Sequence, residues 1–150
     1  MRAAVEGASR TDVLQRVVDA TAGLEPELVE TDGRRLVGEV LRRARRRSLV
    51  VLLTSLEAAA VEEGLLPVLG SLTQRHTVLL AAVADPRVTE LAADRSSAYE
   101  AAAAERSLAE RRRTTTLLRR RGVEVVDAPP DRLAPALADA YLDLKAAGRL

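Results

Sequence analysis

Hydroxyl and carboxylate side chains follow two apolar runs of the sequence, a position from which they can bind a metal ion or cap a helix. Thr54 and Ser55 come directly after residues 49–53, and Asp85 follows residues 77–83. Oxygen ligands of this kind suit a hard cation such as Mg²⁺, although one nearby carboxylate makes a poor cage for a divalent charge. The same residue types are preferred at helix N-caps. A magnesium site and helix capping are therefore alternatives, and the lone carboxylate favours capping.

The sequence offers no set of side chains that matches acid–base or nucleophilic catalysis. The single histidine, His76, precedes a predicted strand, whereas Ser55 and Asp127 follow predicted strands, so a Ser–His–Asp triad is not expected. We expect His76 to be structural or merely exposed. The absence of cysteine excludes thiolate zinc sites and cysteine nucleophiles, and no glycine-rich phosphate-binding motif follows a predicted strand. These observations indicate a chain that is not an enzyme.

Hydrophobic periodicity predicts the elements that position these residues. Helical spacing predicts helices over 11–22, from a cap at Thr31 or Asp32 to about Arg46, over 57–74 with a break at Pro67, over 96–120, and from about Leu133 to Gly148. Short apolar runs predict strands at 49–53, 77–83 and 123–126. Residues 49–53 are apolar on both faces, which is typical of a central strand covered by helices. The alternation indicates an α/β fold with a parallel sheet and right-handed crossovers.

The two edges of such a parallel sheet are expected to differ in charge. Arginines at 45–47, 75 and 119–121 precede the three predicted strands, whereas Asp85 and Asp127 follow strands. We therefore expect one basic and one acidic edge. Ligands of open α/β sheets bind outside the carboxyl ends of the strands, so the acidic edge is the expected place for a site.

The arginine-rich edge has two interpretations. It can contact the phosphate backbone of nucleic acid, or it can consist of solvated helix ends, where cations favour the helix dipole. The net charge is only +1, from 23 basic and 22 acidic residues, so the chain as a whole is not drawn to nucleic acid. Phe and Trp are absent, which leaves no stacking platform for single strands. Solvated helix ends are favoured, and backbone binding stays as the alternative.

The length of the chain, 150 residues, fits one domain that spans residues 1–150 and buries enough surface to form a core. No apolar run approaches the length that spans a bilayer, and the first residues lack the apolar region of a secretory signal. We expect a single domain located in the cytoplasm.

Segments spread along the sequence carry a resemblance to a known family: LEPELVETD, RRRSLVVLLTSLE, AVADP, and the stretch that opens with AYEAAAAERSLAERRR and closes with YLDLKAAGRL. From about Leu24 onward, the chain resembles the C-terminal half of the bacterial domain-of-unknown-function family numbered fifty-eight, whose members are similar to von Willebrand factor A domains. The resemblance implies a Rossmann-like, partial doubly wound sheet of three to four parallel strands flanked by helices, with the first strands of the complete fold upstream of Met1.

The resemblance also implies a degenerate metal-ion-dependent adhesion site. Family members draw its ligands from an Asp-x-Ser-x-Ser loop after the first strand, a middle-loop threonine and an aspartate at a strand end. The first loop has no counterpart in this sequence, and the middle-loop position falls at Thr31 or Asp32. Ser55 replaces the aspartate that usually follows the position of Thr54. With Asp85, these residues form a remnant site, and we expect neither a metal nor a cofactor.

The partners that the resemblance implies are proteins. Family members are associated with MoxR-type AAA+ ATPases and are thought to act as adaptor or assembly modules, often tethered to the membrane by segments that this sequence lacks. We therefore expect a non-catalytic protein-interaction or assembly module. Strand 49–53 carries none of the prolines, lysines or charges that protect a sheet edge, so we expect Leu49, Val51 and Leu53 to pair with a second copy in a homodimer. Exchange of residues 2–6 between copies is the alternative.

Overall fold

The computed structural model describes residues 5, 10–23, 25, 32–94 and 96–150 of a chain that divides into two compact units. The first unit is Met1–Glu30, in which α1 spans Arg10–Ala22 and confirms the helix predicted over 11–22. The second unit is Thr31–Leu150, which contains the sheet and the other described helices.

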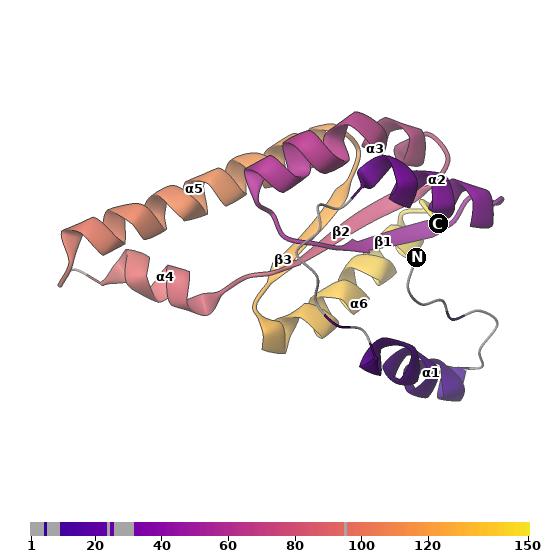
Figure 1. Cartoon of the computed structure of the whole chain (residues 1–150), viewed down its shortest axis with the longest axis horizontal. Helices are drawn as coiled ribbons and strands as arrows, with labels where there is room; N and C mark the ends of the chain where they lie inside the picture. The colour runs from indigo at the N-terminus through magenta and orange to yellow at the C-terminus, as the bar shows by residue number, and fades with distance from the viewer. Residues whose placement is uncertain (1–4, 6–9, 24, 26–31, 95) are drawn as a thin grey trace. The chain divides into compact units, whose positions relative to one another are not determined.

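The second unit is built on a parallel sheet of three strands (Figure 1). In the order β1, β2 and β3, with β2 in the middle, the strands span Leu49–Leu53, Thr77–Val83 and Glu124–Ala128. Val51 of β1 lies in register with Leu79 of β2, and Ala81 of β2 lies in register with Val126 of β3. The α/β class and the parallel strand direction expected from the sequence are therefore confirmed.

Helices cover both faces of this sheet. One face is covered by α2, the π-helical turn η1, α3 and α5, which span Gly33–Arg43, Ala60–Leu65, Leu66–Thr73 and Ala98–Arg120. These helices pack against Val78 and Leu80 of β2. On the other face, α6 (Pro130–Ala146) packs against Leu79 and Ala81. Successive residues of a strand point to opposite faces, so β2 is buried on both sides.

The apolar pattern of residues 49–53 alone predicted a central strand, which is wrong for the described sheet, whereas the unpaired edge on which the expected homodimer depends agrees with the position of β1 at the sheet edge. Within the described residues, β1 pairs with β2 alone. The side chain of Val51 is 44% exposed and that of Leu53 is 74% exposed, because α6 packs on β2 and β3 and leaves much of β1 uncovered. An apolar sequence shows that a strand is suited to burial on both faces, but it does not report how many neighbours the strand has.

The ends of the helices follow local capping signals. Asp32 and Ser97 are the N-caps of α2 and α5, and each accepts a backbone hydrogen bond through its side chain. Helix α2 ends at Arg43, earlier than the end predicted near Arg46. Gly122 has a φ of 80°, the left-handed conformation that favours glycine, and it follows the end of α5 at Arg120, the residue at which the predicted helix also ends.

The segment predicted as one helix over 57–74 contains a wide π-helical turn, η1, directly before α3. Pro67 lies in the first turn of α3, directly after the π-helical turn. At the same turn α2 approaches closely, since a Cβ placed on Gly33 would lie 2.0 Å from the carbonyl oxygen of Gly64. Glycine at position 33 is what permits this approach.

Helix α4 (Pro86–Ala93) was not expected from the sequence. Asp85 caps it and Pro86 occupies its first turn, a combination typical of a helix start. None of the residues of α4 is buried, so it lacks the clear apolar stripe that identifies a helix in a sequence. It packs along α5, and the two helices form a hairpin past the end of β2 (Figure 1).

Candidate functional site

The carboxyl ends of the strands hold the residues predicted to form a remnant metal site. Thr54 and Ser55 directly follow β1, and both are exposed. The backbone N–H of Thr54 donates to the carbonyl of Ala81 at 3.1 Å, which ties this corner to β2. Asp85 follows β2 on the neighbouring strand, and Thr31 lies outside the described residues.

Both carboxylates of the predicted remnant site cap helices. Asp32 accepts the backbone N–H of Arg35 at 3.0 Å, and Asp85 accepts that of Arg87 at 2.9 Å. Each bond satisfies one of the free N–H groups at a helix start. Within the described part of the chain, no three His, Cys, Asp or Glu side chains form a group that could hold a metal ion. The capping interpretation is confirmed for Asp32 and Asp85.

The third carboxylate at this edge, Asp127, is paired with an arginine. Nε and Nη2 of Arg111 each donate to a carboxylate oxygen of Asp127 at 2.7 Å, and Nη2 also donates to the carbonyl of Val83 at 2.8 Å. The hydrogen bond to Asp127 raises the pKa of Arg111, partial burial lowers it, and the charges of Asp127 and Glu57 raise it further. The edge expected to be acidic therefore holds a neutralised carboxylate.

Arg111 was not predicted as a site residue. Its partner lies 16 residues away, on a different element, so no helical spacing of three or four residues marks the pair in the sequence. The signal that identifies the pair is the path of the chain. Strand β3 follows α5 and runs parallel to β2, so it carries Asp127 to the carboxyl end of the sheet, beside the end of β2.

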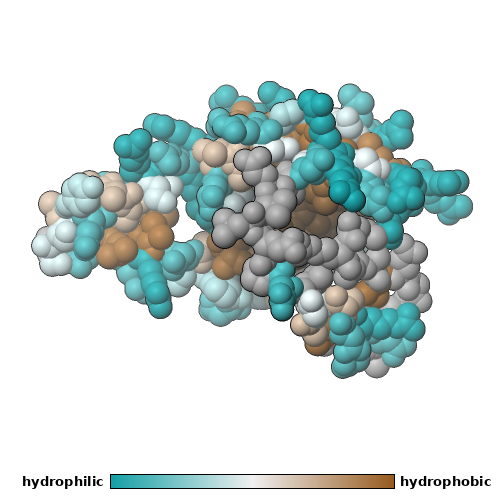
Figure 2. All heavy atoms as spheres, viewed as in Figure 1, coloured by the Kyte–Doolittle hydropathy of each residue, from teal (hydrophilic) through white to brown (hydrophobic). Residues whose placement is uncertain are grey.

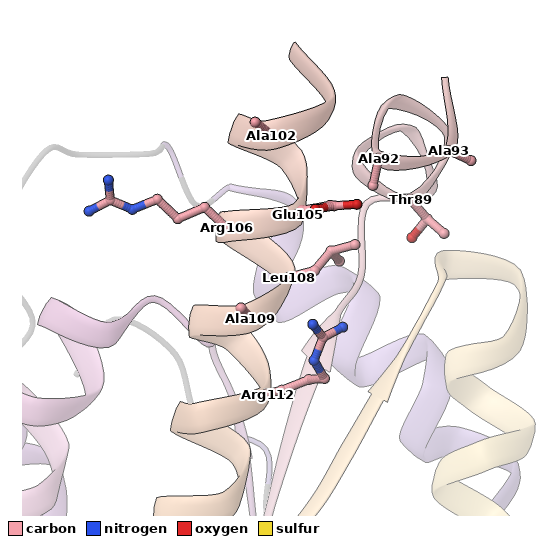
Figure 3. A pocket seen from close by; sticks show the side chains of 9 residues that line it. All are labelled: Thr89, Ala92, Ala93, Ala102, Glu105, Arg106, Leu108, Ala109 and Arg112. Atoms are coloured by element: carbon pink, nitrogen blue, oxygen red, sulfur yellow. The ribbon is translucent and has the colours of Figure 1, made fainter. Parts of the chain in front are cut away.

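An open groove with a volume of about 650 Å³ lies between α4 and α5 (Figure 3). Small side chains leave this space, among them Ala92 on α4 and Ala102 and Ala109 on α5. Glu105 points toward α4, whereas Arg106 points away from it (Figure 3). Apolar side chains gather over this hairpin among hydrophilic ones (Figure 2). With a single carboxylate, the described lining holds no base paired with a nucleophile.

The amino ends of the strands form a second candidate site. Arginines at 45–47, 75 and 119–121 precede the three parallel strands and therefore lie at one edge of the sheet. A pocket of about 360 Å³ opens there, lined by Leu41, Ala44, Arg45, Arg46, Arg47, Arg75 and His76. His76 therefore lies at the end of the strands opposite to Ser55 and Asp127, as the sequence predicted.

His76 itself is buried, with 3% of its surface exposed. Neither Nδ1 nor Nε2 has a hydrogen-bond partner among the residues that the structure describes. The part of the prediction that allowed His76 to be merely exposed is therefore wrong. The reason is that residue 76 leads directly into β2, the strand that is buried on both faces.

The α6 side of β1 forms a third candidate surface. Leu49, Val51 and Leu53 lie in register with residues of β2 that face α6, and Leu49 packs partly against the α6 cluster. Val51 is partly exposed, Leu53 lies largely in solvent, and Val83 at the end of β2 is 53% exposed. The outer edge of β1 has no strand beside it in the described part of the chain.

Comparison with known proteins assigns no family to this chain. No protein-family model, curated protein or solved structure matches this chain. Of the helices that are described, none is both long enough and apolar enough to cross a membrane. The function is therefore inferred from the side chains at the two sheet edges and on β1.

Proposed function

We propose that this chain is a non-catalytic protein-interaction module that binds through β1. The observation that carries the proposal is the exposed apolar side of this strand at Val51 and Leu53. Burying apolar surface stabilises a complex by roughly 25 cal/mol per Å², so these side chains favour a partner over water. Because β1 contains no proline, lysine or other charge, nothing in its own sequence opposes pairing at its outer edge.

The partner that fits this edge is a second copy of the chain. Antiparallel pairing of β1 with its symmetry mate across a two-fold axis gives a continuous sheet and satisfies the free N–H and C=O groups of both edges. Val51, the central residue of the strand, then lies beside the axis, flanked by Leu49 and Leu53. The alternative exchange of residues 2–6 falls outside the described residues, apart from Val5.

The resemblance to domain-of-unknown-function family fifty-eight supports an assembly role. On this proposal the sheet is part of a Rossmann-like, von Willebrand A-like fold, and the remnant site at Asp32, Thr54, Ser55 and Asp85 holds no metal. The capping bonds of Asp32 and Asp85 support this reading, because a carboxylate bound to a helix end is less free to bind a cation. A MoxR-type AAA+ ATPase is the proposed further partner in the cytoplasm.

Light scattering at micromolar concentration tests the pairing. We expect twice the mass of one chain for the wild type and a single-chain mass for Leu53→Lys, since a side chain that is 74% exposed can be replaced without disturbing the core. Leu142→Lys, at an exposed apolar residue of α6, is the matched control and is expected to stay dimeric. A compact wild-type monomer, or a Leu53→Lys variant that remains a dimer, would overturn the proposal.

Nucleic-acid binding at the arginine-rich edge is the alternative function. It is supported by the arginines at 45–47 and 119–121, which share one edge of the sheet. Several phosphate contacts would give a steep loss of affinity for duplex DNA as the salt concentration rises. Absence of measurable binding at low salt would remove this alternative.

A further inference from the structure

The ring of His76 is held where it cannot satisfy its own hydrogen bonds. The backbone N–H of His76 donates to the carbonyl of Leu72 at 2.8 Å, which fixes the turn between α3 and β2. A neutral imidazole offers one donor and one acceptor, yet both ring nitrogens are buried without a partner in the described part of the chain. A buried polar group without a partner carries its full desolvation cost, so a ligand that reaches this ring and bonds to it would recover part of that cost.

The pocket beside this ring carries unbalanced positive charge. Arginines at 45–47 and 75 line it, and no carboxylate does. None of these four arginines forms an ion pair within the described residues. The neighbouring Arg42 and Arg43 are different, because Glu39 pairs with them at 2.5 and 2.8 Å. The pocket therefore favours an anion.

Helix ends explain only part of this arrangement. Helices α2 and α3 both end near the pocket, at Arg43 and Thr73, and cations are stabilised at the negative end of a helix. That effect accounts for exposed arginines in this region. It does not account for His76, whose ring is buried and unbonded rather than solvated.

The walls of the pocket are tied together before any ligand arrives. The backbone N–H of Thr77 donates to the carbonyl of Ser48 at 3.0 Å, and the hydroxyl of Ser48 donates to the carbonyl of Arg46 at 2.9 Å. On the other side, the backbone N–H of Arg75 donates to the carbonyl of Leu72 at 3.1 Å. Less conformational entropy is lost when a ligand binds here, since the backbone around the pocket is already fixed by these hydrogen bonds.

We propose that this pocket binds the phosphate group of a small phosphorylated molecule. The planar guanidinium groups match pairs of phosphate oxygens, and the ring N–H of His76 supplies a further donor. A carboxylate has two oxygens and would leave most of these donors unused. The volume of about 360 Å³ is near the lower end of ligand pockets, which run from about 300 to 1,000 Å³. Leu41 and Ala44 supply an apolar wall for the rest of the ligand.

A small molecule fits this site better than a nucleic-acid strand. Duplex recognition uses a row of phosphate contacts along an exposed surface, whereas this pocket is concave and has the buried residue His76 in its lining. The pocket lies at the amino ends of the strands, and phosphate binding there does not depend on the pairing proposed for β1.

Thermal unfolding of the full chain in inorganic phosphate or pyrophosphate, compared with chloride at equal ionic strength and pH, tests the site. We expect a saturable rise in Tm with either phosphate, because a ligand that binds only the folded state stabilises it. Arg75→Gln is expected to weaken phosphate binding about tenfold, the loss of one charge-assisted contact. Arg132→Gln, at an exposed arginine of α6 outside the pocket, is the control and should bind like the wild type.

His76→Leu separates binding from folding. Leucine removes both unbonded nitrogens, so in chloride the variant is expected to be at least as stable as the wild type, while most of its response to phosphate is lost. If this variant does not fold, Arg46→Gln and Arg75→Gln decide the question, because both side chains are exposed.

Three outcomes would overturn the proposal. One is a wild-type response to phosphate no larger than its response to chloride. Another is an unchanged phosphate affinity in both Arg46→Gln and Arg75→Gln. The third is duplex DNA binding that depends on Arg75 while phosphate and pyrophosphate have no effect, which would assign this edge to nucleic acid.

Discussion

Arg111 on α5 holds both carboxylate oxygens of Asp127 on β3, each at 2.7 Å. The two side chains are 24% and 27% exposed, so the pair is partly shielded from water. The same guanidinium bonds to the carbonyl of Val83, and one side chain therefore joins α5 to two strand ends. This bidentate, charge-assisted pair links a helix to the carboxyl edge of the sheet.

Arg111→Ala is expected to lower the free energy of unfolding by about 1–2 kcal/mol, since Asp127 and the Val83 carbonyl lose charge-assisted hydrogen bonds. Arg112→Ala is the control, because the next arginine of the helix is exposed, and its effect should stay within about 0.5 kcal/mol. Urea unfolding measures both values. Equal effects of the two substitutions would show that the Arg111 pair adds nothing to stability.

Glu39 makes part of the stability of α2 depend on pH. Hydrogen bonds from Arg42 and Arg43 lower its pKa from 4.5 to about 2. A pKa that is lower in the folded state means that the contribution is complete above pH 4.5 and is lost as the pH falls through about 2. The Tm advantage of the wild type over Glu39→Gln should therefore shrink across this window, and it should also shrink in high salt because solvent reaches the pair, with 27% of the Glu39 side chain and 70% of the Arg42 side chain exposed. An advantage that stays constant across this pH range would contradict the assignment.

Two glycines of α2 are expected to respond to alanine with opposite signs. Gly33→Ala places a Cβ 2.0 Å from the carbonyl oxygen of Gly64, so the helices must separate, at a cost of about 1–3 kcal/mol. Gly38→Ala meets nothing within 4 Å and should stabilise the helix by about 0.5–1 kcal/mol. Thermal or urea unfolding of both variants measures the difference. Stabilisation by Gly33→Ala would mean that α2 and η1 do not pack in this way.

The absence of cysteine allows a direct test of the β1 pairing. In an antiparallel pair centred on Val51, the two symmetry-related Cα atoms lie about 4.5–5.5 Å apart, within the range of about 4.4–6.8 Å that a disulfide spans. Val51→Cys is therefore expected to form a covalent dimer on mild oxidation, visible on a non-reducing gel. Leu142→Cys is the control and should stay unlinked. Equal crosslinking of the two variants would indicate random collision rather than a β1 interface.

Local sequence patterns predicted the helices and strands of this fold better than they predicted how these helices and strands are arranged in space. The run at Leu49–Leu53 and its position between helices identified a parallel strand correctly. Its place at the sheet edge depends on what lies beside it, which no property of five apolar residues reports. A capping role for Asp32 and Asp85 was expected from their residue types, because capping is decided within a few residues, although α4, the helix that Asp85 caps, was not predicted.

The site residues that the sequence did not reveal all depend on distant contacts. The role of Arg111 requires the path of the chain from α5 back through β3. The burial of His76 requires β2 to be covered on both faces by helices that come from other parts of the sequence. A side chain that sits beside a strand start can be solvated or enclosed, and only the packing of those helices decides which.

The hairpin of α4 and α5 has a consequence for the time scale on which different parts of the chain open. Helix α4 buries no residue, and in the first half of α5 only Ala104 is buried, whereas Thr114 and Leu118 anchor the second half. Segments that bury little apolar surface unfold locally at a smaller free-energy cost than the core. Backbone amides of α4 and early α5 should therefore exchange with deuterium long before those of β2, and a protease should cut these segments before it cuts β2.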